Sequence, residues 1–212
     1  MKTLSFGPLR SRKPPQQQRA VQRVNVILQA TAECLADGAL LDLSTTIIAN
    51  RAGIPVSSIY RYFPTLDALL LELYLQTASE LREALFEIFA DQDRFPGWRD
   101  RLGAVLSMQR DYLARHPYYR PLLMRFITNR GPVAVEDEDH EELYSFLRSR
   151  WAAGGDGFHG GDPTVVANTT VQIALAMEDL IAAQTDRDAS RPYSAELSVI
   201  LEGYLANYLR DD

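Results

Sequence analysis

The 212-residue chain has one cysteine, Cys34, so it cannot form an internal disulfide bond. It has no run of 18 apolar residues that would span a membrane, and residues 1–15 lack the apolar segment of a signal peptide. We therefore expect a cytoplasmic protein with no membrane partner. Cys34 falls among apolar residues of the first predicted helix, which favours a buried structural thiol over a redox sensor.

Motifs of common catalytic and metal sites are also missing from the sequence. There is no CxxC, HExxH or glycine-rich phosphate loop, and His116 and His159 are isolated. The acidic run 136–142 contains the third histidine and would be an alternative site for a divalent metal. Acidic residues are, however, favoured at a helix N-terminus, and consecutive ones point in different directions, so we expect a solvated helix start. We predict no enzymatic activity, no metal and no cofactor.

Beyond residue 64 the sequence lacks the alternation of a β-strand and keeps a helical period, interrupted by proline and glycine. With 46% hydrophobic residues the chain has enough material for a sizeable core. The sequence therefore predicts an all-α fold of about nine helices. The later helices are predicted over residues 66–90, 98–115, 118–128, 137–153, 163–184 and 194–209.

Residues 44–63 are typical of two short helices around a glycine turn. Ser44 is a good N-cap, and apolar residues recur at helical spacing from there to Ala52. Gly53 is predicted to end this helix because glycine accepts the positive φ of a sharp exit. Pro55 has the fixed φ of a first-turn residue and cannot continue the preceding helix.

The second short helix carries Ile59 and Phe63 one turn apart, so both are expected to face inward. The remaining surface then consists of small, polar and phenolic side chains, which suit the major groove and the phosphates of DNA. The pattern indicates a DNA-reading helix-turn-helix. A helical hairpin that binds nothing is the alternative.

Charge is distributed unevenly along the chain, whose net charge is −6. Residues 1–63 carry eight basic and three acidic side chains, a net charge of +5, whereas the remainder carries −11. A basic head is the electrostatic footprint of phosphate binding, and an acidic body repels DNA. The charge distribution therefore favours DNA binding over the inert hairpin.

Residues 19–70 resemble the N-terminal domain of the TetR family of bacterial transcriptional regulators. The resemblance rests on Ile48-Ala49, Ala52-Gly53-Ile54, Ile59-Tyr60-Arg61-Tyr62-Phe63 and a following Leu69. It covers roughly the first third of the chain. Two departures stand out: Pro55 replaces the usual serine and removes a side-chain N-cap, and Leu66 replaces a usual lysine that contacts phosphate.

The resemblance implies three regions along the chain. Residues 1–18 form a basic flexible arm, 19–64 the helix-turn-helix domain, and 65–212 an effector-binding and dimerisation bundle. In the arm, Arg12 and Lys13 lie beside prolines and glutamines and are candidates to reach an adjacent groove; a solvated tail is the alternative. We predict DNA contacts at Arg12, Lys13, Thr45, Thr46, Arg51, Val56, Ser57, Ser58, Tyr60, Arg61 and Tyr62.

A helix-turn-helix reader gains affinity by spanning two half-sites, so we expect a homodimer on a palindromic operator. The resemblance implies that the two C-terminal helices of each subunit form the interface. Burial of these apolar stripes inside one subunit is the alternative. The predicted interface residues are Val166, Thr170, Ile173, Met177, Ile200, Leu201, Tyr204, Leu205 and Tyr208.

A bundle that moves the DNA-reading heads apart needs an enclosed effector site between its middle helices. We expect a small, largely apolar or aromatic effector that releases DNA from a repressor, repression being the family's usual role. An architectural or partner-recruiting DNA-binding protein without effector is the alternative. The predicted pocket residues are Trp98, Leu102, Met108, Tyr112, Tyr119, Leu123, Phe126, Tyr144, Leu147, Trp151 and Met177.

Overall fold

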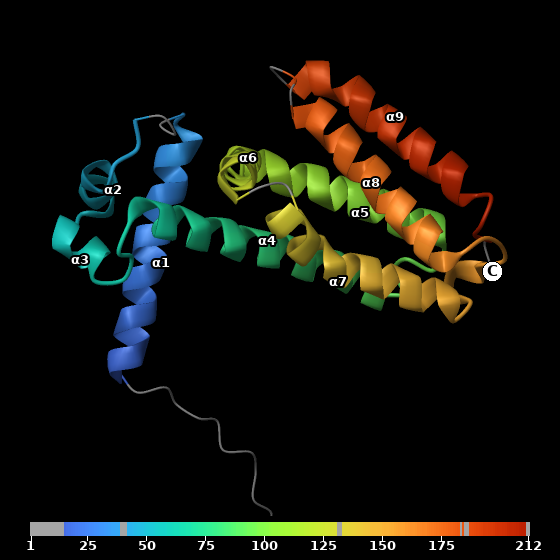
Figure 1. The fold of residues 1–212 in the computed structure, drawn as a ribbon, viewed down its shortest axis with the longest axis horizontal. Helices are drawn as coiled ribbons and strands as arrows, with labels where there is room; N and C mark the ends of the chain where they lie inside the picture. Colours follow the sequence, from blue (N-terminus) through green and yellow to red (C-terminus); the bar gives the residue numbers. More distant parts are fainter. Residues whose placement is uncertain (1–14, 39–41, 131–132, 183, 185–186, 211–212) are drawn as a thin grey trace, which may run out of the picture. The chain divides into compact units, whose positions relative to one another are not determined.

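The computed structural model describes residues 15–38, 42–130, 133–182, 184 and 187–210, and within these ranges every regular element is a helix (Figure 1). The elements are α1 (Pro15–Ala36), α2 (Thr45–Ala52), α3 (Val56–Tyr60), α4 (Leu66–Ala90), α5 (Trp98–Arg115), α6 (Tyr119–Arg130), α7 (Val133–Ala152), the short 3₁₀ helix η1 (Gly155–Gly157), α8 (Pro163–Ala182) and α9 (Arg187–Leu205). The predicted all-α fold is confirmed. None of the helices in these ranges is long and apolar enough to cross a membrane.

The chain divides into two compact units, with the boundary between Leu73 and Tyr74 inside α4. In the first unit α1 packs on α2, and α2 packs on α3. The side chains that fill this unit include Ile27, Cys34, Ile48, Ile59, Phe63 and Leu69. Cys34 is thus buried, as predicted, and burial raises the pKa of its thiol despite the opposing charge of Arg51.

The predicted caps of α2 are confirmed. The Ser44 hydroxyl accepts a hydrogen bond from the Ile47 amide at 3.3 Å. At the other end Gly53 adopts φ +63°, and the Gly53 and Ile54 amides donate to carbonyls of the last turn at 3.3 and 3.0 Å. Pro55 precedes α3 without any side-chain cap, as its sequence implies. The turn therefore follows from local chemistry.

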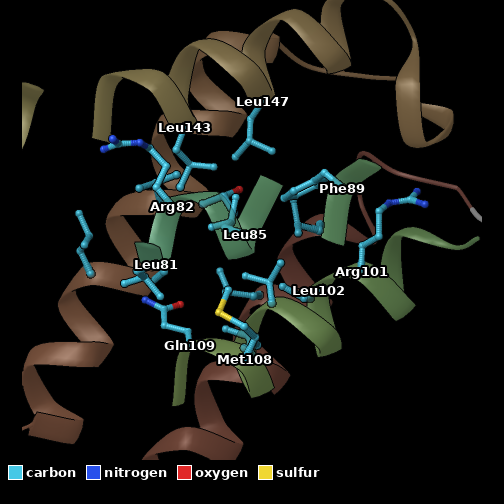
Figure 2. A pocket seen from close by; sticks show the side chains of 18 of the residues that line it. Leu81, Arg82, Leu85, Phe89, Arg101, Leu102, Met108, Gln109, Leu143 and Leu147 are labelled. Carbon is cyan, nitrogen blue, oxygen red and sulfur yellow. The ribbon is translucent and has the colours of Figure 1, made fainter. Parts of the chain in front are cut away.

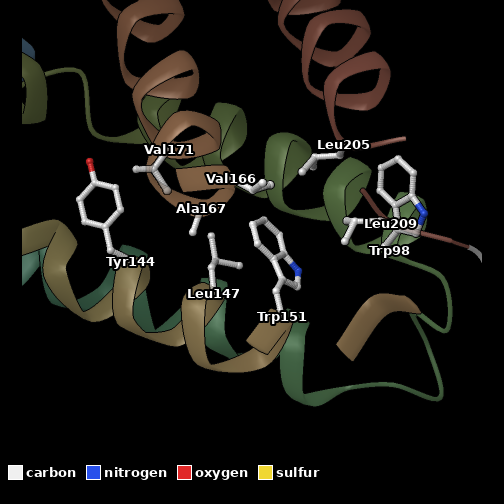
Figure 3. Packing of buried hydrophobic residues seen from close by; sticks show 9 residues of the cluster. All are labelled: Trp98, Tyr144, Leu147, Trp151, Val166, Ala167, Val171, Leu205 and Leu209. Atoms are coloured by element: carbon white, nitrogen blue, oxygen red, sulfur yellow. The ribbon is translucent and has the colours of Figure 1, made fainter. Parts of the chain in front are cut away.

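In the second unit α8 packs against both α7 and α9, and α5 packs against α9 (Figure 1). Figure 3 shows Leu147 and Trp151 projecting from α7 toward Val166 and Ala167 on α8. Trp98 of α5 and Leu205 and Leu209 near the C-terminus extend the same buried cluster. The interior of this unit is thus built from helices that are distant in sequence.

A buried ionic cluster closes one end of this bundle around Asp156, which lies in η1 with φ +58°. Its carboxylate accepts hydrogen bonds from Arg101, from Arg150 at 2.7 and 2.8 Å, and from the Trp151 indole at 3.0 Å. Arg101 also donates to the Phe95 and Pro96 carbonyls at 2.6 and 2.8 Å. One carboxylate therefore joins the start of α5 to the end of α7.

The glycines beside Asp156 are required by space as well as by backbone angle. A Cβ on Gly157, at φ +63°, would lie 2.8 Å from the Arg210 carbonyl oxygen. The Arg210 amide donates to the Asp156 carbonyl at 3.2 Å, so the chain after α9 is bonded to this loop. The glycine-rich segment 154–161, predicted only to end a helix, thus forms a specific connection.

Three predicted helix starts are wrong, and the last helix also ends at Leu205 and not at residue 209. Helix α9 begins at Arg187, not Ser194, and includes the exposed Pro192, which lacks an amide to donate within the helix. Helix α7 begins at Val133, so the acidic run 136–142 lies within the helix and not at its start. Helix α1 begins at Pro15, within the predicted arm, because proline fits the first helical turn.

Candidate functional site

The first candidate site is the exposed surface of α3 and the start of α2 in the first unit. Ile59 of α3 is fully buried, which turns Ser57, Tyr60 and Arg61 toward solvent. Thr46 on α2 is also exposed, while Val56, Ser58 and Tyr62 are partly buried. The residues that sequence analysis predicted for DNA contact thus include a surface free to meet a groove.

Two of the predicted DNA-contact residues, Thr45 and Tyr60, are hydrogen-bonded to each other. Thr45 is only 9% exposed, and its hydroxyl lies 3.1 Å from the Tyr60 hydroxyl. The Tyr60 ring remains 52% exposed. This hydrogen bond connects the first residue of α2 to the last residue of α3, so Thr45 is positioned to set the angle between the helices.

Arg51, another predicted DNA-contact residue, is already paired with acidic side chains of its own chain. Its guanidinium donates to Asp37 at 2.7 Å and lies 3.6 Å from Glu33, both near the end of α1. The Asp37 hydrogen bond raises the pKa of Arg51 above its ordinary value. These exposed ion pairs compete with any phosphate for the guanidinium. Arg12 and Lys13, predicted in the arm, lie outside the described residues.

The second candidate site is a cavity of about 170 Å³ within the second unit. Helices α4, α5, α7, α8 and α9 contribute most of its lining, with Tyr119 from α6. Figure 2 shows Leu81, Leu85 and Phe89 of α4 facing Leu102 and Met108 of α5 across it. The lining is largely apolar, which suits a small ligand with an apolar body.

Six of the eleven predicted effector residues line this cavity: Trp98, Leu102, Met108, Tyr119, Leu147 and Trp151. The other five, Tyr112, Leu123, Phe126, Tyr144 and Met177, are not among the residues that line it. The Tyr112 hydroxyl lies instead 3.0 Å from both the Thr77 carbonyl oxygen and a Glu80 carboxylate oxygen, which share its single proton, and burial raises the pKa of Tyr112. The prediction for these five is corrected: helical spacing identified buried faces without showing which face meets the cavity.

Sequence analysis missed the polar residues of the lining, chiefly Gln109 and Glu178. Glu178 is 9% exposed and accepts a hydrogen bond from Gln109. The sequence does contain a signal for Glu178, because Glu178 and Asp179 are the only charged residues of α8. Within the described residues, no cluster of histidine, cysteine and acidic side chains is arranged to hold a metal.

The predicted dimer surface needs correction. Val166, Thr170, Leu201 and Leu205 are each less than 9% exposed within their own chain, because they face the interior of the bundle. Ile173, Met177, Tyr204 and Tyr208 are partly buried, and Ile200 is 40% exposed. Other apolar side chains on α8 and α9 are exposed instead: Val165, Leu180, Tyr193 and Val199.

Comparison with known proteins gives matches to the first unit and to the whole fold. Residues 27–73 match the family model described as bacterial regulatory proteins, tetR family. An uncharacterised HTH-type transcriptional regulator from Mycobacterium bovis is 31% identical over 100 residues, which are 47% of this chain and 49% of that protein. The chain spans about half the length of the curated relatives it matches.

Solved structures share the fold over most of their length. A TetR-family transcriptional regulator from Streptomyces coelicolor has a TM-score of 0.58 at 24% identity, with 88% of this chain and 99% of that chain covered. A protein from Mesorhizobium loti assigned to the same family has a TM-score of 0.66 at 17% identity, with 91% and 99% covered. From the helix-turn-helix and these matches together, the first unit is similar to the DNA-binding domain of the TetR family of bacterial transcriptional regulators, and the described chain shares the fold of solved members of that family.

Proposed function

We propose that the protein represses transcription by binding a palindromic operator as a homodimer, and that a small, largely apolar or aromatic effector releases it. The observation that carries the proposal is the exposed face of α3 beside α2, which is capped at both ends and buries Ile48 and Ala49. That arrangement presents short polar side chains to a major groove on a rigid support. Because the family consists of transcriptional regulators, no catalytic role is proposed.

Base reading is assigned to the exposed Thr46 and Ser57, with Val56 and Ser58 beside them. Tyr60, Arg61 and Tyr62 are assigned to phosphates, for which hydroxyl and guanidinium donors are suited. Thr45 is given a positioning role, because its hydroxyl pairs with Tyr60. Arg51 reaches phosphate only if it leaves Asp37.

Dimerisation is assigned to the exposed apolar side chains of α8 and α9. Val165, Leu180, Tyr193, Val199 and Ile200 are 38–64% exposed, although they are large and hydrophobic. Burying such a surface against a second copy provides the apolar core of an interface. Two reading heads are then held together, which a palindromic operator requires.

The cavity in the second unit supports effector control. A ligand enclosed by five helices alters their packing, and it shifts the population toward whichever conformation it binds more tightly. An architectural role without an effector would be better matched by a fully packed interior. The cavity therefore favours the switch.

Fluorescence anisotropy with the intergenic DNA beside the coding sequence tests DNA binding, at two salt concentrations and with nonspecific competitor. Tight, salt-sensitive binding that resists competitor is expected. Arg61→Ala should weaken binding to all sequences and lower the salt slope by about one unit, whereas Ser57→Ala should change sequence preference. Binding no tighter than to random DNA would remove the proposal.

A further inference from the structure

Glu178 lies where the apolar cavity meets a second, more polar hollow. The second hollow has a volume of about 630 Å³ and is lined by α5, α6, α8 and α9. Leu106, Gln109 and Glu178 line both spaces. A ligand that passes from the polar hollow into the apolar cavity would therefore meet this carboxylate.

The charge of Glu178 is incompletely compensated by its surroundings. One carboxylate oxygen accepts a hydrogen bond from the neutral Gln109. The other lies 3.6 Å from Arg120, whose guanidinium is closer to Asp179, at 2.8 Å. Two carboxylates thus share one guanidinium, which leaves one net negative charge at a side chain that is 10% exposed.

The other charged groups of the apolar cavity are satisfied by the protein. Arg101 pairs with Asp156 at one end, and Arg82 lies 2.9 Å from Glu142. Figure 2 shows the guanidinium groups of Arg82 and Arg101 directed away from the leucines that line the interior. Glu178 is therefore the lining charge whose only counter-charge in the lining of these two spaces, Arg120, is shared with a second carboxylate.

The cavity extends along α4 from Ala78 to Phe89, which is about 16 Å at the rise of an α-helix. Gln109, Tyr119 and Glu178 belong to this lining, as do Phe89 and Trp151, beside which the charges of Arg101 and Asp156 compensate each other. The shape suits an elongated apolar body with a single charged group.

We propose that the effector is a lipophilic cation whose positively charged nitrogen pairs with the Glu178 carboxylate while its apolar body fills the cavity lined by α4 and α5. The inference rests on the proposed effector site and names its ligand class. A cation replaces the missing counter-charge of a buried carboxylate, whereas an anion of the same shape meets repulsion and a neutral analogue leaves the charge unpaired.

Binding should depend on pH in a defined direction. Burial, opposed by Arg120 and assisted by Asp179, raises the pKa of Glu178 to about 7. A permanent cation binds the ionised form, so its affinity rises with pH through this value. The polar hollow contains other charged groups, and burial lowers the pKa of His116 below its ordinary value. The remaining charged residues that line it are Arg110, Asp111, Arg120, Asp188 and Arg191.

The test uses decyltrimethylammonium, decanol and decanoate below their micelle concentrations, with tryptophan fluorescence as readout. Trp98 and Trp151 are the only two tryptophans of the chain, and both line the cavity. At pH 8 the cation should bind at least about tenfold more tightly than decanoate, and its affinity should fall about tenfold by pH 6 as Glu178 gains a proton.

Glu178→Gln should abolish both the preference for the cation over decanoate and the pH dependence of cation binding. The control Glu196→Gln, at an exposed residue, should change neither. A second measurement uses the unaltered protein, so its result does not depend on whether the variant folds. Calorimetry at pH 7 in buffers of different ionisation enthalpy should show release of about half a proton per cation bound.

Equal binding of decanoate, no binding of the cation, or an unchanged affinity in Glu178→Gln would overturn the cation assignment. An effector role for the cavity would survive equal binding of decanoate. Conversely, a cation that binds through Glu178 but leaves operator affinity unchanged would overturn the proposed switch and leave the site intact.

Discussion

Asp156 combines a left-handed backbone with a carboxylate that is 3% exposed, and two arginines and a tryptophan bond to it. Burial by itself would raise its pKa, but hydrogen bonds and charge from Arg150, followed by the charge of Arg101, hold the pKa of Asp156 below its ordinary value. The carboxylate is thus ionised at neutral pH and joins α5 to α7, while the backbone carbonyl of the same residue accepts from the Arg210 amide after α9.

Asp156→Asn keeps the size of the side chain and its tolerance of positive φ, so it isolates the charge. We expect a loss of about 3 kcal/mol in the free energy of unfolding, because buried Arg101 loses its counter-charge. Urea unfolding at pH 7 checks this value. A loss no larger than that of an exposed variant such as Asp162→Asn would contradict it.

The same pair of proteins should show a defined pH dependence. Since the folded pKa of Asp156 is lowered, its contribution is fully present above the unfolded pKa of about 4 and is lost as the pH falls through the folded value. The difference in the free energy of unfolding between the unaltered protein and Asp156→Asn should therefore stay constant from pH 8 to pH 5 and shrink below pH 5. A difference unchanged down to pH 2 would count against an ionised carboxylate.

At the scale of the element, the turn from α2 to α3 depends on Gly53, and Pro55 adds no side-chain cap to α3. Gly53 has φ +63°, and a Cβ built there meets nothing within 4 Å. Glycine is thus required by backbone angle alone. Since α3 has five residues and no side-chain cap, its position depends on packing of Ile59 and on the Thr45–Tyr60 hydrogen bond.

Gly53→Ala should lower the free energy of unfolding by about 1 kcal/mol, the cost of a left-handed residue with a Cβ. Gly103→Ala is the matched control: it lies inside α5 with open space around its Cβ and should gain about 0.5–1 kcal/mol. Thermal melting of both variants checks the opposite signs. A stabilising Gly53→Ala would contradict the observed φ.

At the scale of the molecule, a basic N-terminal region precedes an acidic remainder, and large apolar side chains are exposed on α8 and α9. The first property favours contact with DNA through the N-terminal region alone. The second favours association between like helices. Both follow from surfaces and not from the buried cores.

Val199→Asp should convert the proposed dimer to a monomer and weaken operator binding by at least about tenfold, because Val199 is 64% exposed on α9 and an aspartate there opposes apolar burial. Gel filtration with light scattering measures the mass, and anisotropy measures the affinity. Val26→Asp, at a 43% exposed valine of α1, should leave the mass unchanged. A monomeric unaltered protein at micromolar concentration would refute the interface.

The helical class, the caps at Ser44 and Gly53 and the resemblance of the first unit to the TetR family could be predicted from the sequence, because they depend on local propensity and on spacing over a few turns. The sequence also identified the apolar faces of the later helices. It did not determine which predicted residues meet the cavity or remain exposed: Tyr112 turns to Glu80, and Leu201 turns inward. Nor did it bring Arg101 to Asp156 or Gln109 to Glu178, which are 55 and 69 positions apart. Only tertiary packing decided those pairs, because the direction of a helical face is fixed by the neighbours against which it is buried.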